Sequence, residues 1–171
     1  EFLPDMIIVH GDRVEALAGA IVGMLNNILV AHIEGGELSG TVDGLIRHAI
    51  SKLAHIHFVT NNQAAHRLIQ MGESRERIYI IGSPEIDIML SNELPSIELT
   101  KSYYEIPYKK YSILIYHPVT TKLERLRENV KQVIDATIES GENYVVIYPN
   151  NDIGSEIILD ELKRLSDNSR F

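Results

Sequence analysis

Residues 6–25 read MIIVHGDRVEALAGAIVGML, and this stretch decides how the rest of the chain is interpreted. Residues 6–10 form a short continuous apolar run, which is typical of a strand buried on both faces. Residues 13–25 are rich in Ala, Val, Leu and Ile at helical spacing. The stretch therefore predicts one strand followed by one helix, joined by a tight polar turn at Gly11 and Asp12.

The same alternation continues through the first half of the chain. Strands are predicted at 28–33, 56–60 and 78–81, and helices at 45–54 and from Asn61 or Asn62 to Met71. An asparagine can cap the last of these helices and Gly72 can end it. Strands that alternate with helices of this length predict βαβ units and a parallel sheet, so the fold class is α/β.

A second, shorter series of elements follows an irregular segment. Residues 92–110 contain Pro95 and Pro107 and show no clear period, so they are predicted to connect two lobes. Strands are then predicted at 112–116 and 144–148, and helices at 121–140 and 153–165, the first opened by a capping box from Thr121 to Glu124. The predicted domains are residues 1–91, part of an N-terminal lobe, and residues 111–171, part of a C-terminal lobe.

Neither predicted lobe holds a full doubly wound sheet. The chain begins without an initiator methionine, and no stopping signal precedes Phe171. We therefore expect the chain to be an internal piece of a longer protein.

Composition excludes several classes of function. The 171 residues carry a net charge of −8, which argues against a general nucleic-acid binder with its basic patch. There is no cysteine, and hence no disulfide framework and no thiol catalysis. No apolar run approaches the roughly 20 residues that span a bilayer, and no signal peptide is visible. A cytoplasmic protein without a membrane partner is predicted.

Ionisable residues gather where the predicted strands end. Ligands of open α/β sheets bind beyond the carboxyl ends of the strands. Asp12 follows the first strand, Glu34 the second, and His117 the strand at 112–116. Plainer interpretations remain open: Asp12 could cap the next helix, Asp43 could be the N-cap of a helix at 44–54, and Glu34 and His117 could be ordinary strand-end residues.

No cofactor or metal site is predicted. His55, His57 and His66 lie close in sequence, but their spacing matches no zinc pattern and no cysteine supports them. Gly35 and Gly36 belong to neither of the glycine-rich phosphate-binding motifs.

Five segments together resemble one enzyme family: HGDRVEALAGA, HIEGGELSGTVDGLIRHAISKLAHIH, IIGSPEIDIM, YHPVTT and IYPNNDIGSE. They are similar to the hydrolysing UDP-N-acetylglucosamine 2-epimerases of the sialic-acid pathway, which make N-acetylmannosamine and UDP. The resemblance implies two Rossmann-like lobes of the GT-B type, a UDP-sugar substrate and a homo-oligomer. Members of the family are about twice as long, so we expect this piece alone to be inactive and to bind UDP weakly or not at all.

The resemblance also implies a mechanism and a set of residues. UDP leaves C1 while a base removes the C2 proton, giving a 2-acetamidoglucal to which water then adds. The implied catalytic residues are Asp12, Glu34, Asp43 and His117, and the implied substrate-binding residues are Arg47 and Asp87. Inversion at C2 needs carboxyl groups on two faces of the sugar, one of them protonated in at least one step.

Four alternatives remain beside this hypothesis. A non-hydrolysing 2-epimerase would release UDP-N-acetylmannosamine, although its family usually reads HVEAGLRT where this chain reads HIEGGELSGTVD. A related hydrolysing enzyme would act on a UDP-diacetamido sugar. A glycosyltransferase of the same two-lobed fold would transfer the sugar, and a truncated, non-catalytic piece would do none of these.

Overall fold

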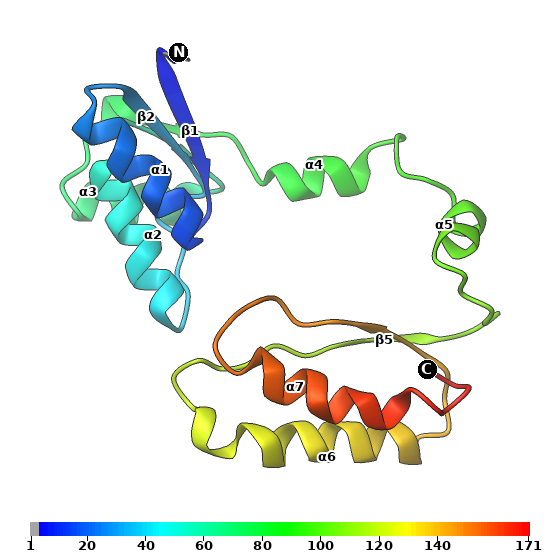
Figure 1. Ribbon diagram of the computed structural model, residues 1–171. Helices are drawn as coiled ribbons and strands as arrows, with labels where there is room; N and C mark the ends of the chain where they lie inside the picture. Colours follow the sequence, from blue (N-terminus) through cyan, green and yellow to red (C-terminus); the bar gives the residue numbers. More distant parts are fainter. Residues whose placement is uncertain (1–3) are drawn as a thin grey trace. The chain divides into compact units, whose positions relative to one another are not determined.

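The strands predicted in the first half of the chain form one parallel sheet. The computed structural model (Figure 1) describes residues 4–171. The sheet has the order β1-β2-β3-β4. Its strands are β1 (Met6–His10), β2 (Leu29–Ile33), β3 (Ile56–Val59) and β4 (Ile78–Ile80). In the register, Val9 pairs with His32, and His32 pairs with His57. Because all four strands run in the same direction, their carboxyl ends lie at one edge of the sheet.

Three helices connect these strands. They are α1 (Val14–Leu25), α2 (Val42–Leu53) and α3 (Asn62–Gln70), and a 3-10 turn, η1 (Arg75–Arg77), precedes β4. Asn61 caps α3 as predicted, since its side chain accepts a hydrogen bond of 2.9 Å from the Ala64 N–H. Gly72 follows α3 with a φ of +91°, a left-handed conformation that glycine adopts without steric cost.

The core of this part lies between the helices and one face of the sheet. Right-handed connections between neighbouring parallel strands place successive helices on the same face. The buried apolar side chains on that side are Val9, Ala20, Val30, Ile50, Val59, Ala64, Ala65 and Leu68. Strand residues that alternate with them, such as Ile8 and Tyr79, are exposed.

A second unit contains the elements that follow Leu94. The chain divides into two compact units, the first ending at Leu94 and the second covering Pro95–Phe171. In the second, β5 (Ser112–Ile115) pairs in parallel with β6 (Tyr144–Ile147). The helices α6 (Leu126–Glu139) and α7 (Ser155–Leu162) supply most of the buried core. This core comprises Leu126, Val130, Ile134, Ile158 and Leu162 from the two helices, and Leu165 just beyond α7. Two 3-10 turns, η2 (Leu123–Arg125) and η3 (Lys163–Leu165), also belong to this unit.

The alternative interpretation of Asp43 as an N-cap is wrong. The extended residue before α2 is Thr41, and Asp43 is the second residue of the helix. Gly44 explains the earlier start: it is buried, and a Cβ there would lie 2.7 Å from the Ser39 carbonyl oxygen. Only glycine allows residues 39–41 to pack this closely against the first helical turn.

The predicted capping box at Thr121 is also wrong. The 3-10 turn η2 intervenes, and α6 begins at Leu126 without a side-chain cap. Leu126, Val130 and Ile134 recur every four residues and are all buried, so their packing sets the start of the helix. Burial of this stripe outweighs a cap, which contributes about 1 kcal/mol.

Two short helices had no signal in the apolar periodicity. These are α4 (Pro84–Leu90), which opens with a proline, and α5 (Ile97–Tyr103). The second lies inside the segment 92–110 that was predicted as an irregular connection, and Ser96 caps it by accepting a 3.2 Å bond from the Leu99 N–H. Among residues 4–171, no helix combines the length and apolar character that crossing a membrane requires.

Candidate active site

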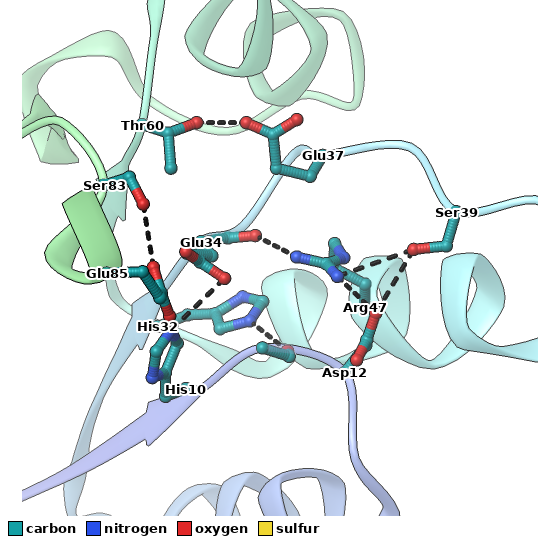
Figure 2. Close-up of polar contacts among 11 residues, drawn as sticks. His10, Asp12, His32, Glu34, Glu37, Ser39, Arg47, Thr60, Ser83 and Glu85 are labelled. Atoms are coloured by element: carbon teal, nitrogen blue, oxygen red, sulfur yellow. Dashed lines mark hydrogen bonds and ion pairs between the residues drawn. The ribbon is translucent and has the colours of Figure 1, made fainter. Parts of the chain in front are cut away.

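Two loops at the carboxyl edge of the first sheet bring together residues that are distant in sequence. One loop continues β1 through Gly11 and Asp12, and the other continues β2 through Glu34. A backbone hydrogen bond of 3.0 Å from the Gly11 N–H to the Ile33 carbonyl ties the two loops together. Figure 2 shows the side chains of Asp12, Glu34 and Arg47 around this junction.

Arg47 of α2 binds both loops at once. Its Nη2 forms an ion pair with Asp12 Oδ2, and its Nη1 donates a 2.9 Å hydrogen bond to the Glu34 carbonyl. Ser39 adds a second donor to Asp12, with Oγ 3.2 Å from Oδ2. Only 11% of the Arg47 side chain is exposed, so this guanidinium positions Asp12 and the Glu34 backbone. Contact between Arg47 and a substrate stays a prediction.

Glu34 occupies an unusual backbone conformation. Its φ is +64°, in the left-handed region that side chains other than glycine adopt at a cost. The Glu34 N–H donates a 2.8 Å bond to the Phe58 carbonyl, so β3 and Arg47 together hold the residue in place. This conformation brings the Glu34 carboxylate to 3.2 Å from His10 Nε2.

Glu85 joins this pair from α4. Its Oε1 lies 3.5 Å from His10 Nε2, and its Oε2 accepts a 2.8 Å bond from the Ser83 hydroxyl (Figure 2). Burial raises the pKa of Glu34, and the neighbouring Glu85 carboxyl raises it further. The Ser83 hydroxyl lowers the pKa of Glu85, so a proton taken up by the two carboxyls resides on Glu34.

These three residues could also hold a cation. The imidazole nitrogen and carboxylate oxygens of His10, Glu34 and Glu85 lie within 4.8 Å of one another, and no other such group occurs among residues 4–171. His10 is the last residue of the strand predicted at 6–10, but sequence reasoning missed Glu85. The rule that places sites after parallel strands could have found it, because Glu85 follows β4 by five residues.

The remaining carboxylates of the first unit have other surroundings. Asp43 is exposed and accepts a 3.1 Å bond from the Thr41 hydroxyl. Asp87 is exposed in α4, two residues beyond Glu85. Glu37 binds the end of β3, accepting bonds from the Thr60 hydroxyl and from Asn61 Nδ2. The described contacts therefore join Asp12 to Glu34 through Arg47 but include neither Asp43 nor Asp87.

His117 follows β5 in the second unit. Its Nδ1 accepts a long hydrogen bond of 3.5 Å from the Asn150 N–H, which follows β6. His117 therefore stands at the carboxyl end of a parallel strand, as predicted, and Asn150 stands at the carboxyl end of the neighbouring strand. That His117 acts with the carboxylates of the first unit stays a prediction.

Comparisons with known proteins place these motifs in one family. The family model described as UDP-N-acetylglucosamine 2-epimerase matches residues 1–171. A protein of Neisseria meningitidis serogroup B named UDP-N-acetylglucosamine 2-epimerase is 58% identical over 162 residues, which cover 95% of this chain. A Legionella pneumophila protein named UDP-N,N'-diacetylbacillosamine 2-epimerase (hydrolyzing) is 38% identical over 96% of this chain.

A solved structure supports the same fold. The chain is similar, with a TM-score of 0.75 and 18% identity over 98% of its length, to Methanocaldococcus jannaschii UDP-GlcNAc 2-epimerase in complex with UDP-GlcNAc and UDP. It covers 48% of that chain, 43% of the Neisseria protein and 44% of the Legionella protein. The predicted Rossmann-like α/β fold, of the GT-B type, is thereby confirmed. The chain belongs to the UDP-N-acetylglucosamine 2-epimerase family.

Proposed function

We propose that this chain supplies the carboxylate side of the active site of a hydrolysing UDP-N-acetylglucosamine 2-epimerase. The observation that carries the proposal is the pairing of two differently held carboxyls, Asp12 and Glu34, at the carboxyl ends of β1 and β2. Their shared attachment to Arg47 fixes the spacing between the two loops.

The proposed reaction requires a base and an acid. In the first step a base takes the C2 proton, the C1–O bond to UDP breaks, and the electron pair forms the C1=C2 double bond of a 2-acetamidoglucal. In the second step water adds its oxygen to C1, and a proton returns to C2 on the opposite face. Each well-positioned acid or base contributes about 10²–10⁴-fold to such a reaction.

The surroundings of the two carboxyls suggest different roles. Asp12 is ion-paired to Arg47, so we assign it as the base that accepts the C2 proton. Glu34 has a raised pKa caused first by burial and then by Glu85, so we assign it as the acid that returns a proton. His117 is proposed to stabilise or protonate the departing diphosphate as an imidazolium.

The product distinguishes a hydrolysing epimerase from a non-hydrolysing epimerase and from a glycosyltransferase. This chain spans less than half of its relatives' length, so the assay uses the full-length protein. Supplied with UDP-N-acetylglucosamine, the full-length protein should release N-acetylmannosamine and UDP, which ¹H and ³¹P NMR would detect. In D₂O the product should carry deuterium at C2, because the acid that returns a proton to C2 exchanges that proton with the solvent. Sugar that keeps its UDP would favour the non-hydrolysing enzyme, and transfer to an acceptor would favour a glycosyltransferase. A parallel assay with a UDP-diacetamido sugar tests the substrate that the Legionella relative's name suggests.

The pH dependence of kcat should shift when the carboxyl of Glu85 is removed. Because the Glu85 carboxyl raises the pKa of Glu34, Glu85→Gln should lower that pKa and move the alkaline limb of the kcat profile to lower pH. The sign follows from the acid role, in which Glu34 must be protonated to act. Glu93→Gln removes an exposed carboxylate nearby in sequence and serves as the control. An alkaline limb that does not move in Glu85→Gln would refute the acid role of Glu34.

A further inference from the structure

His32 of β2 is the most completely buried ionisable residue beside the proposed site. Its side chain has no exposed surface, and both ring nitrogens have partners. Nε2 lies 2.8 Å from the Gly11 carbonyl oxygen, and Nδ1 lies 3.0 Å from Ser51 Oγ. Figure 2 shows the His32 ring beneath the Glu34 loop.

These partners determine where the imidazole proton lies. A carbonyl oxygen only accepts, so Nε2 must carry the hydrogen that is shared with Gly11. Burial lowers the pKa of His32 to about 4, although the hydrogen bond to Gly11 acts in the opposite direction. The charges of His57, Arg47 and His10 lower the pKa further, so the ring is neutral at pH 7. The unprotonated Nδ1 then accepts from the Ser51 hydroxyl.

The ring is also fixed by close packing. A Cβ at Gly35 would lie 2.9 Å from Ser51 Oγ and 3.0 Å from His32 Nδ1. The absence of a side chain at Gly35 therefore permits the contact between His32 and Ser51. The second glycine of this arrangement, Gly11, has a φ of +73° at the turn after β1.

Both polar groups of Gly11 are bound to β2. Its N–H donates to the Ile33 carbonyl at 3.0 Å, and its carbonyl accepts from His32. The next residue is Asp12, whose carboxylate is held separately by Arg47 and Ser39. The backbone that carries Asp12 is thus anchored by one neutral histidine.

We propose that His32 is a positioning residue for Asp12. By donating its Nε2–H to the Gly11 carbonyl, it fixes the backbone from which the Asp12 carboxylate extends. Only the expected effect on catalysis rests on the proposed function; the anchoring of the Gly11 backbone by His32 does not. The plainer interpretation is a core histidine whose loss affects stability without any specific effect on Asp12.

Two amide variants separate these interpretations. In His32→Gln the amide N–H₂ reaches the position of Nε2, whereas in His32→Asn the shorter side chain reaches only the position of Nδ1. We expect His32→Gln to keep most of the turnover. We expect His32→Asn to lose about 10²-fold in kcat with little change in KM, since a displacement of about 1 Å costs that much. Equal losses in the two variants would overturn the proposal.

A double-mutant cycle tests the connection to Asp12. In an Asp12→Asn background, the kcat penalty of His32→Asn should disappear, while its effect on the melting temperature should persist. A purely structural histidine would instead give kcat penalties that multiply in the double variant. That result would also overturn the proposal.

A readout without turnover separates this proposal from the proposed function. Long-range ¹H–¹⁵N NMR should show His32 as the neutral Nε2–H tautomer, and the Gly11 amide should exchange faster in His32→Asn than in His32→Gln. An Nδ1–H tautomer, or equal exchange in both variants, would overturn the positioning role even in an active protein. Absence of epimerase activity in a protein with the expected tautomer and exchange would overturn the proposed function and leave the His32 anchor supported.

Discussion

Glu34→Gln is expected to reduce kcat for UDP-N-acetylglucosamine by about 10²–10⁴-fold, the usual contribution of one acid or base. Glutamine has nearly the same shape, and the bond from Arg47 goes to the Glu34 backbone carbonyl, so the loop should keep its position. The substitution therefore removes the carboxyl and leaves the backbone contacts. Steady-state kinetics with UDP release as the readout would measure the effect.

The same motif offers a matched control. Glu37→Gln makes the same chemical change three residues away, in a side chain that accepts bonds from Thr60 and Asn61. A glutamine oxygen can still accept both bonds, so kcat should change little. Comparable losses in Glu34→Gln and Glu37→Gln would indicate a general disturbance of the loop and contradict the acid role of Glu34.

Acid should destabilise the first unit through its buried histidines. The pKa of His32 is lowered to about 4 by burial, whereas an unfolded imidazole titrates at about 6.5. Between these values the unfolded chain binds more protons, so the stability present above about pH 6.5 is lost as the pH falls toward 4. His32 alone accounts for about 3 kcal/mol over this window. Burial also lowers the pKa of His57, which adds a loss of the same sign.

Hydrogen exchange of the β2 amides would measure this loss within the first unit. After correction for intrinsic exchange, protection of the β2 amides should fall by up to about tenfold per pH unit for each proton taken up. His32→Gln should flatten the dependence, whereas His66→Gln, at an exposed position in α3, should not change it. Protection that stays constant across the window in the unmodified protein would contradict the lowered pKa.

Local patterns in the sequence predicted the strands well because their apolar runs reflect burial directly. The parallel order followed from the alternation with helices, and Asn61 carried a cap signal that the fold uses. The starts of α2 and α6 could not be predicted in the same way. The close approach at Gly44 and the buried stripe from Leu126 are tertiary effects, and both outweigh local capping.

The candidate site was predictable in part for a related reason. Asp12 and Glu34 follow apolar strands, so the rule for parallel sheets identifies them. Glu85 belongs to the short helix α4, and its approach to His10 depends on how β4 lies in the sheet. His32 looks like an ordinary strand residue in the sequence, because its bonds to Gly11 and Ser51 join residues 21 and 19 positions apart.

At residue 34, stability and activity favour different residues, because the left-handed backbone favours glycine and the proposed chemistry requires a carboxyl. Exchanging the glutamate for glycine would relieve about 1 kcal/mol of steric cost, as it does at other left-handed sites. A consensus or thermostability design that scores conformational preference alone would favour this exchange, and it would delete the carboxyl on which the proposed chemistry depends. Engineering of this scaffold should therefore hold residue 34 constant and seek its gains elsewhere.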